Sequence, residues 1–322
     1  MFDIITIGDS TVDNYAMIDE QNPDIHLSTN KKLLCLDYAD KINIFEAGTA
    51  VGGNATNVAV GTKRLGLKSA LLTELGQDLN AEFIISQLKK EKINTSLLKQ
   101  NKRNKTRSSL VLNYRGERTI LSYQSKRKYT FPSLPKTKWI YYTSLGEGYE
   151  SLQNKLTAYL KKHPETKLAV NPGSYQIKNT PDLFKKILPF TDLLFVNKEE
   201  AQRLTQTKLS LLHLFTKLHD LGAKIVVITD GQNGSYASDG ILSYYLPPHN
   251  VKNISKTGAG DAYASGFLSA FIQGKHLDEA MQWGNANAIS VIGHIGAQVG
   301  LLSSKQLPTY LKKFKNTLIK SM

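Results

Sequence analysis

Short β-rich runs alternate with amphipathic stretches along most of the chain, and this alternation restricts the fold more than any other feature. Apolar, strand-like runs occupy residues 2–8, 69–76, 139–145, 167–173, 192–197 and 224–231. Apolar residues recur at the helical spacing of three and four in residues 55–66, 81–93, 149–163, 180–190 and 210–222. Repeated strand–helix–strand units form a mostly parallel sheet covered by helices. We therefore predict one doubly wound α/β domain over residues 1–322.

Two segments interrupt this rhythm, because they alternate polar and apolar residues without an intervening helix. The first covers approximately residues 11–47, and the second lies within residues 106–125, where RSSLVLNYRGERTILSYQ has the pattern of a hairpin turning at Arg115-Gly116. We expect the two segments to form a small antiparallel sheet that stands off the main sheet as a lid. No internal repeat or flexible linker divides the chain.

The chain has one cysteine, Cys35, which excludes an intramolecular disulfide and a multi-cysteine metal site. This composition fits a reducing compartment, and we expect Cys35 to be packed. The start MFDIITIG has no basic segment before its apolar run, and no stretch approaches the roughly 18 apolar residues of a membrane span. We therefore expect a soluble cytoplasmic protein with no membrane partner.

The net charge of +14, from 41 Lys and Arg against 27 Asp and Glu, could attract polyanions. Much of the lysine lies at helical surface spacing, however, and the sequence has no recognised DNA- or RNA-binding motif. Aromatic residues are not interleaved with the basic ones, as a stacking platform for bases requires. A lysine-rich surface is thus favoured over nucleic-acid binding, which would weaken steeply with salt.

The stretch KTGAGDAYASGF, residues 256–267, places small residues and a carboxylate before a helical apolar pattern that Gly274 can end. Small residues let a ligand approach the backbone, and the N–H groups of a first helical turn attract anions. A carboxylate at Asp261 would repel phosphate unless it takes a proton from an attacking hydroxyl. The run therefore predicts an anion hole beside a base, with a helix cap and a tight loop as the alternative.

A second glycine-rich run, GGNATNVAVGTKRLG, covers residues 52–66 and also leads into a helix. Its glycine spacing is wrong for a dinucleotide-binding fingerprint. Gly52 and Gly53 permit close approach, while the amides of Asn54 and Asn57 suit a polyhydroxylated substrate. Asn as a turn former is the alternative.

These two stretches, in this order and about 200 residues apart, resemble the two signatures of the ribokinase-like (PfkB) family of carbohydrate kinases. The resemblance also includes GDSTVD near the N-terminus, GERTIL, NPG, NKEE, TDGQNG and the late NANAISVIGHIGA. It implies a ribokinase-like fold. It also implies phosphoryl transfer from ATP with Mg²⁺ to a hydroxymethyl group of a sugar or nucleoside.

The resemblance assigns roles to the residues that match the signatures. Asp261 matches the catalytic base, and the amides of Gly258, Ala259 and Gly260 match the anion hole. Asp13 matches the carboxylate that grips sugar hydroxyls, whereas Asp9, at the edge of a strand, is a weaker candidate. The remaining substrate-side matches are Gly52, Gly53 and Asn57.

Residues that match the nucleotide site lie at strand ends. Asn197 and Glu200 match a motif that positions Mg²⁺ and phosphate through water, with a helix N-cap and a first-turn acid as the alternative. Asn171 also follows a strand, and the carboxyl ends of parallel strands face one crevice. Thr229, Gly231 and Gly234 match the turn that holds the triphosphate and ribose, and Asn285 matches a residue of the adenine pocket.

The acceptor stays open, with a free sugar such as ribose or a hexose first. A nucleoside is second, stacked on Tyr15 or Tyr123. A sugar phosphate is third, held by Arg107, Lys126, Arg127 and Lys128, although basic residues on exposed strand edges commonly deter aggregation instead. A non-catalytic sugar or nucleotide sensor is the alternative outside the enzymes. Lids of similar kinases often pair, so a homodimer through the lid is also expected.

One departure from the family pattern concerns monovalent cations. Many relatives read Asp-Thr-x-Gly-Ala-Gly-Asp, and their first acid helps to bind an activating cation; this chain has Ser255 and Lys256 at the first two positions. We predict that potassium activation is weak or absent, because the Lys256 ammonium partly replaces the ion. Initial rates should change little when potassium is exchanged for a bulky organic cation, whereas a strong dependence on potassium would contradict the hypothesis.

Overall fold

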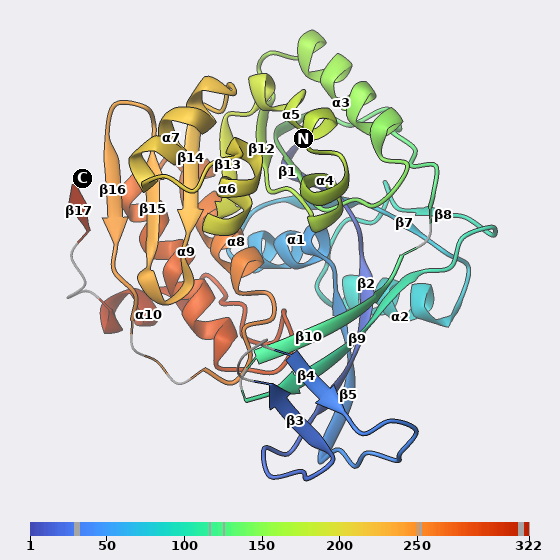
Figure 1. Ribbon diagram of the computed structural model, residues 1–322. Helices are drawn as coiled ribbons and strands as arrows, with labels where there is room; N and C mark the ends of the chain where they lie inside the picture. The colour runs from blue at the N-terminus through green and yellow to red at the C-terminus, as the bar shows by residue number, and fades with distance from the viewer. Residues whose placement is uncertain are drawn as a thin grey trace.

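A nine-stranded sheet forms the centre of the protein (Figure 1). The computed structural model describes residues 1–28, 33–115, 117–124, 126–249, 251, 253–314 and 319–321. The strand order is β17-β16-β15-β14-β13-β12-β11-β1-β6. Its parallel strands are β1 (Phe2–Ile7), β6 (Ser69–Leu72), β11 (Thr137–Tyr142), β12 (Lys167–Val170), β13 (Leu193–Asn197) and β14 (Ile225–Thr229). Its antiparallel edge consists of β15 (Ser235–Ser238), β16 (Ser243–Leu246) and β17 (Lys320–Ser321).

Helices cover both faces of this sheet. Successive residues of a strand therefore pack into different hydrophobic cores. Ile5 packs into the core under α3–α7, whereas its neighbour Ile4 packs on the opposite side with α8 and α9 residues. The first set is α3 (Glu150–Lys162), α4 (Ser174–Asn179), α5 (Pro181–Lys185), α6 (Lys198–Thr205) and α7 (Leu211–Asp220). The second is α1 (Asn54–Arg64), α2 (Leu79–Lys90), α8 (Ala259–Ile272), α9 (Leu277–Ile292) and α10 (Leu307–Lys313).

A separate four-stranded sheet extends from the main one, and we call it the lid sheet (Figure 1). Its order is β10 (Glu117–Tyr123), β9 (Arg107–Tyr114), β2 (Thr11–Met17) and β5 (Glu46–Gly52). Two smaller pairs accompany it, β3 (Ile25–Ser28) with β4 (Leu33–Leu36), and β7 (Glu74–Leu75) with β8 (Lys99–Gln100). The predicted fold class is confirmed: a mixed, mostly parallel sheet is flanked by helices and accompanied by a smaller sheet.

Several local expectations were wrong. The lid sheet is not antiparallel throughout, because β2 and β9 pair in parallel. Residues 180–190 do not form one helix, because Pro189 lacks an N–H and restricts the residue before it, so α5 ends at Lys185 and a 3₁₀ turn spans Leu188–Phe190. Cys35 is exposed on β4 rather than packed. The predicted hairpin at Arg115-Gly116 is confirmed, since β9 and β10 are antiparallel and Tyr114 pairs with Glu117, although Gly116 itself lies outside the described residues. No helix in the described ranges is long and apolar enough to cross a membrane.

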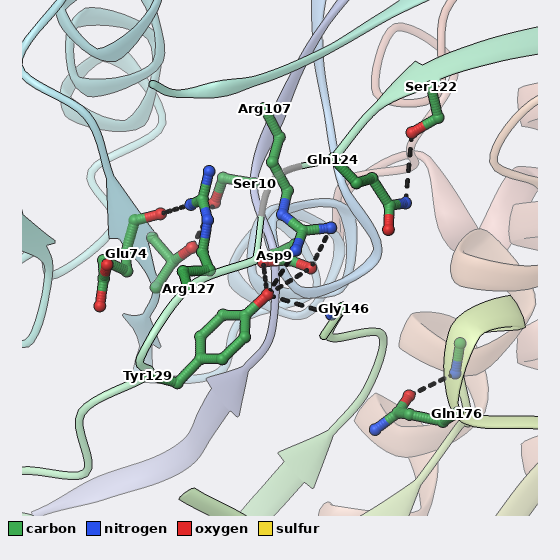
Figure 2. Close-up of polar contacts among 12 residues, drawn as sticks. Asp9, Ser10, Glu74, Arg107, Ser122, Gln124, Arg127, Tyr129, Gly146 and Gln176 are labelled. Atoms are coloured by element: carbon green, nitrogen blue, oxygen red, sulfur yellow. Dashed lines mark hydrogen bonds and ion pairs between the residues drawn. The ribbon is translucent and has the colours of Figure 1, made fainter. Parts of the chain in front are cut away.

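A buried polar cluster joins the main sheet to the start of β9 (Figure 2). The Arg107 guanidinium lies 3.1 Å from the Asp9 carboxylate, and it donates a 2.6 Å hydrogen bond to the Tyr129 hydroxyl. That hydroxyl donates to Asp9 at 3.1 Å, and Asp9 and Arg107 are only 5% and 2% exposed. Asp9 therefore holds the lid sheet to the end of β1, and its carboxylate is already occupied by protein groups.

The cluster also changes the interpretation of two basic residues. Arg127 is 3% exposed and donates to the carbonyl oxygens of Glu74 and Lys105 at 2.9 and 2.6 Å. Arg107 and Arg127 thus do not lie on an exposed edge, and their guanidinium groups are taken up by the protein. Neither a second-phosphate site nor protection of a strand edge fits these two residues.

We predict that Arg107→Met lowers the free energy of unfolding by about 3–5 kcal/mol, because it leaves the Asp9 carboxylate buried without its charge partner. Lys126→Met is the matched control, since the Lys126–Glu147 ion pair is 73% and 48% exposed and should contribute at most about 1 kcal/mol. Urea denaturation measures both. Equal losses for the two variants would contradict the importance of burial.

Candidate active site

The glycine-rich run before α8 forms a helix N-terminus that is open to a ligand. Gly258 adopts the left-handed conformation at φ 79°, and α8 begins at Ala259. A Cβ atom on Gly258 would lie 2.4 Å from the Ala297 Cβ, whereas one on Gly260 would meet nothing within 4 Å. The N–H groups of Gly260 and Asp261 have no hydrogen-bond acceptor among the described residues. The expected helix start is therefore present, with two N–H donors free for an anion.

Asp261 lies in the first turn of α8, and its side chain is nearly inaccessible, at 7% exposed. Burial raises the pKa of this carboxyl group to about 6, while hydrogen bonds from Asn57 and Asn54 and the charge of Arg118 oppose the rise. The charge of Asp13 raises the pKa further. Asp261 is thus mostly ionised at neutral pH, yet it is a stronger base than an exposed aspartate.

Asn57 holds this carboxylate in place. Its Nδ2 donates a 2.8 Å hydrogen bond to Asp261 Oδ2, and its Oδ1 accepts a 2.9 Å bond from Gln298 Nε2. Both ends of the amide are therefore occupied by protein partners. The structure places Asn57 behind the acid, whereas sequence reasoning expected it to face a sugar.

Asp13 lies on β2, directly opposite Ala50 of β5 and Ser109 of β9. Burial raises the pKa of its carboxyl group, and the Thr11 hydroxyl donates to it at 2.9 Å. Gly52 is required beside it, since a Cβ atom there would lie 2.1 Å from Asp13 Oδ2. Asp13 is thus desolvated without a countercharge.

A cavity separates the lid sheet from the loops around α8 and α9, and we call it the lid cavity. It is lined by Asp13, Tyr15, Ala50, Val111, Asn113, Ser255, Thr257, Ile295, Gly296 and Ala297. Tyr15 therefore reaches this space. Tyr123 pairs with Ser108, one position out of phase with the Asp13–Ser109 pair, so it lies on the opposite face of the lid sheet.

A larger cavity of about 640 Å³ lies on the other side of the α8 N-terminus, and we call it the nucleotide cavity. Its lining includes Ala259 and Gly260 at the helix start, together with Lys256 from the preceding loop. Thr229, Gly231, Gly234 and Asn285, which the sequence assigned to the nucleotide, line it as well. Gly231 and Gly234 have φ values of 52° and 90°, which favour glycine at these positions of the turn.

Asn171, Asn197 and Glu200 follow the neighbouring strands β12 and β13 but do not line either cavity. The Asn171 amide donates to the Phe195 carbonyl at 2.8 Å. Asn197 caps α6, and it exchanges 2.9 Å hydrogen bonds with Glu200. Burial raises the pKa of Glu200 to about 7, and the charge of Asp261 adds to the rise. The alternative prediction, a helix N-cap followed by an acid in the first turn, is therefore present in the structure. Glu200 also lies close enough to Asp261 for the charge of Asp261 to raise its pKa.

The acidic groups around the start of α8 are better suited to a hydrated magnesium ion than to an ion coordinated by protein side chains alone. Among the described residues, no three His, Cys, Asp or Glu side chains are grouped to hold a metal. Mg²⁺ usually keeps several waters and binds one or two carboxylates together with substrate phosphates. A single half-buried carboxylate, Glu200, meets this requirement only when a phosphate and water complete the shell.

Sequence reasoning missed the charged contacts between the lid sheet and the loop before α8. Lys256 forms an ion pair with Glu117 at the start of β10. The charge of Asp261 partly offsets the lowering of the Arg118 pKa by desolvation. Asn113 and Val111 of the lid cavity were missed as well. The alternation of Ser109, Val111 and Asn113 along β9 was the available signal, because residues two apart share a face.

Comparisons with known proteins agree with this arrangement. The profile described as pfkB family carbohydrate kinase matches residues 14–304. A 5-dehydro-2-deoxygluconokinase from Clostridium beijerinckii is 26% identical, covering 97% of this chain and 94% of that protein. A nucleoside kinase from Methanocaldococcus jannaschii is 27% identical, with 85% and 89% coverage. The Arabidopsis thaliana ribokinase structure with ribose and ATP has a TM-score of 0.77 at 18% identity, covering 97% and 99% of the two chains, and shows the common fold.

The family match and the curated relatives identify a sugar or nucleoside kinase, a phosphotransferase that acts on an alcohol group. The chain belongs to the pfkB family of carbohydrate kinases.

We predict that Asp261→Asn is more stable than wild type above pH 6. The pKa of Asp261 is raised from 3.8 to about 6, so the folded wild type loses stability as the pH rises through this interval, by up to about 3 kcal/mol. Asparagine carries no charge, and the advantage should disappear near pH 4. Urea denaturation at both pH values tests this, with Asp182→Asn, which is 86% exposed, as the control. A difference independent of pH would contradict the raised pKa.

Proposed function

We propose that the chain transfers the γ-phosphoryl group of ATP to a hydroxymethyl group of a sugar, ribose- or hexose-like, with Asp261 as general base. The observation that carries the proposal is a buried carboxylate beside two free N–H donors, at a helix start whose residues Ala259 and Gly260 line the nucleotide cavity. Asp261 takes the hydroxyl proton while the oxygen forms a bond to the γ-phosphorus. The bond to the β–γ bridging oxygen breaks, and ADP leaves with its electron pair.

The other residues serve binding and charge stabilisation in this proposal. The Gly258–Gly260 segment receives the phosphoryl oxygens, and Thr229, Gly231, Gly234 and Asn285 hold the nucleotide. Glu200 holds Mg²⁺ through water, and the ion, when bound, neutralises charge on the phosphates. Asp13 accepts hydrogen bonds from acceptor hydroxyls, because a desolvated carboxylate without a countercharge is a strong acceptor.

A nucleoside acceptor is the second candidate, and Tyr15 in the lid cavity favours it, since a flat ring there could stack on a base. A nucleoside kinase also stands among the relatives. A sugar phosphate has less support, because Arg107 and Arg127 are buried and paired.

We predict that purified protein releases ADP when a panel of sugars and nucleosides is offered with ATP and Mg²⁺. Asp261→Asn should lower kcat by about 10²–10⁴-fold, because proton transfer loses its base, and should still bind the acceptor. Asp182→Asn should match wild type. Saturable binding by wild type without any turnover would instead identify a sensor and contradict the kinase.

A further inference from the structure

Two ion pairs connect the parallel strands β13 and β14, one at each end of the strands. At the carboxyl ends, Lys198 Nζ lies 2.8 Å from Asp230 Oδ2, and each residue directly follows its strand. At the amino ends, Lys224 Nζ lies 2.9 Å from Asp192 Oδ1, and each residue directly precedes its strand. Ligands of open α/β sheets collect outside the carboxyl ends of the strands. Of the two pairs, the Lys198–Asp230 pair is therefore the one placed to affect a ligand.

The turn after β14, residues 229–234, has one side toward the nucleotide cavity and another toward α6, and we call it the nucleotide turn. Asp230 and Asn233 do not line the cavity. The Asp230 carboxylate instead accepts hydrogen bonds from Lys198 Nζ at 2.8 Å and from Asn233 Nδ2 at 3.2 Å. Its polar side chain thus serves the protein. The members of the turn that line the cavity are Thr229, Gly231, Gln232 and Gly234.

Hydrogen bonds within the nucleotide turn close it on itself. The Asp230 N–H donates to the Gly234 carbonyl at 2.9 Å, and the Asn233 N–H donates to the Asp230 carbonyl at 2.9 Å. The Tyr236 hydroxyl donates to the Asn233 carbonyl at 3.3 Å, and the Tyr236 ring stacks on Tyr245 at 4.8 Å between centroids. The ion pair with Lys198 attaches this closed turn to the start of α6.

The attachment joins two parts of the nucleotide site. Lys198 is the first residue of α6, between the Asn197 cap and Glu200, which the proposed function assigns to hydrated Mg²⁺. The side chains of Lys198 and Asp230 are 38% and 17% exposed, so the pair is partly shielded from water. Without Lys198, the Asp230 carboxylate would leave an unpaired negative charge beside the turn, and like charges repel more strongly where water is partly excluded.

We propose that the Lys198–Asp230 ion pair is a positioning element for the nucleotide. It holds the nucleotide turn against the start of α6, and it neutralises a carboxylate that would otherwise repel the triphosphate. The proposal rests on the proposed kinase function. Lys198 and Asp230 act as positioning residues, since neither lines the nucleotide cavity. A direct contact between Lys198 and a phosphate is a different role, which the following experiments distinguish.

The first experiment measures equilibrium binding of ATP and of ADP, each with Mg²⁺, by calorimetry. Lys198→Met should weaken binding of both nucleotides by about tenfold, because it loses the attachment and leaves the Asp230 charge unpaired. Asp230→Asn should weaken binding by about threefold, because it loses the attachment alone. Adding Asp230→Asn to Lys198→Met should restore part of the affinity, since the unpaired charge is removed. A direct Lys198–phosphate contact predicts instead that Asp230→Asn strengthens ATP binding and that the double variant gains nothing.

Lys224→Met is the matched control, because it removes the ion pair of similar length at the other end of the same two strands. Both nucleotide affinities should stay within about twofold of wild type. An equal loss in Lys224→Met and Lys198→Met would show that the ion pair only stabilises the sheet, and it would overturn the proposal. Unchanged affinities in Lys198→Met would overturn it as well.

The second experiment measures steady-state kinetics of the same variants with an acceptor that supports turnover. Lys198→Met should raise the KM for ATP by about tenfold, with kcat and acceptor KM within about twofold of wild type, because binding is lost equally from the ground state and the transition state. A loss of kcat without a change in the KM for ATP would contradict positioning of the nucleotide. If wild type binds nucleotides without turnover, the kinase function fails, and the affinities still test the ion pair. A wild type that binds neither nucleotide would overturn both proposals.

Discussion

The hydrogen bond between Asn57 and Asp261 joins two helix starts that lie 204 positions apart in the chain. It requires α1 and α8 to pack closely, and Gly61 permits this approach, since a Cβ atom there would lie 2.3 Å from Ser265 Oγ. A glycine inside a helix costs about 1 kcal/mol relative to alanine. Taken alone, α1 is therefore less stable with Gly61 than it would be with alanine at this position. Burial alone would raise the pKa of this carboxyl group further, and hydrogen bonds from Asn57 and Asn54, together with the charge of Arg118, hold it at about 6.

Local patterns predicted the parts of the molecule whose determinants are local. The strand runs, the helix beginning after Gly258 and the tight approach at Gly52 follow from residue type and spacing over a few positions. Contacts between distant residues could not be predicted in this way. The burial of Arg107 depends on Asp9, far back in the chain, and a basic residue in a strand gives no sign of such a partner. Tyr15 and Tyr123 looked equivalent as stacking residues, yet the strand register places them on opposite faces of the lid sheet.

The lid sheet is attached at its two ends by interactions of different strength. At the end of β1, Asp9, Arg107 and Tyr129 form a buried, hydrogen-bonded group (Figure 2), and breaking it would leave charge in a medium of low polarity. Near α8, the Lys256–Glu117 pair is 37% and 66% exposed, so water can replace each partner at a cost of about 1 kcal/mol or less. The buried attachment at the end of β1 therefore contributes more to holding the lid sheet in place than the exposed pair near α8.

Under the proposed function, discrimination between acceptors comes from the lid cavity and not from the α8 start. Relatives named as kinases of a gluconate derivative and of a nucleoside share this family, so the common fold does not determine the substrate. In the proposed reaction, the groups around Asp261 act on a hydroxyl and a phosphoryl group, which every such reaction supplies. Tyr15, Ala50, Val111 and Ile295 instead give the lid cavity an apolar wall opposite the polar side chains of Asp13 and Asn113. The proposed function therefore favours an acceptor with hydroxyls on one side and a flat or apolar surface on the other.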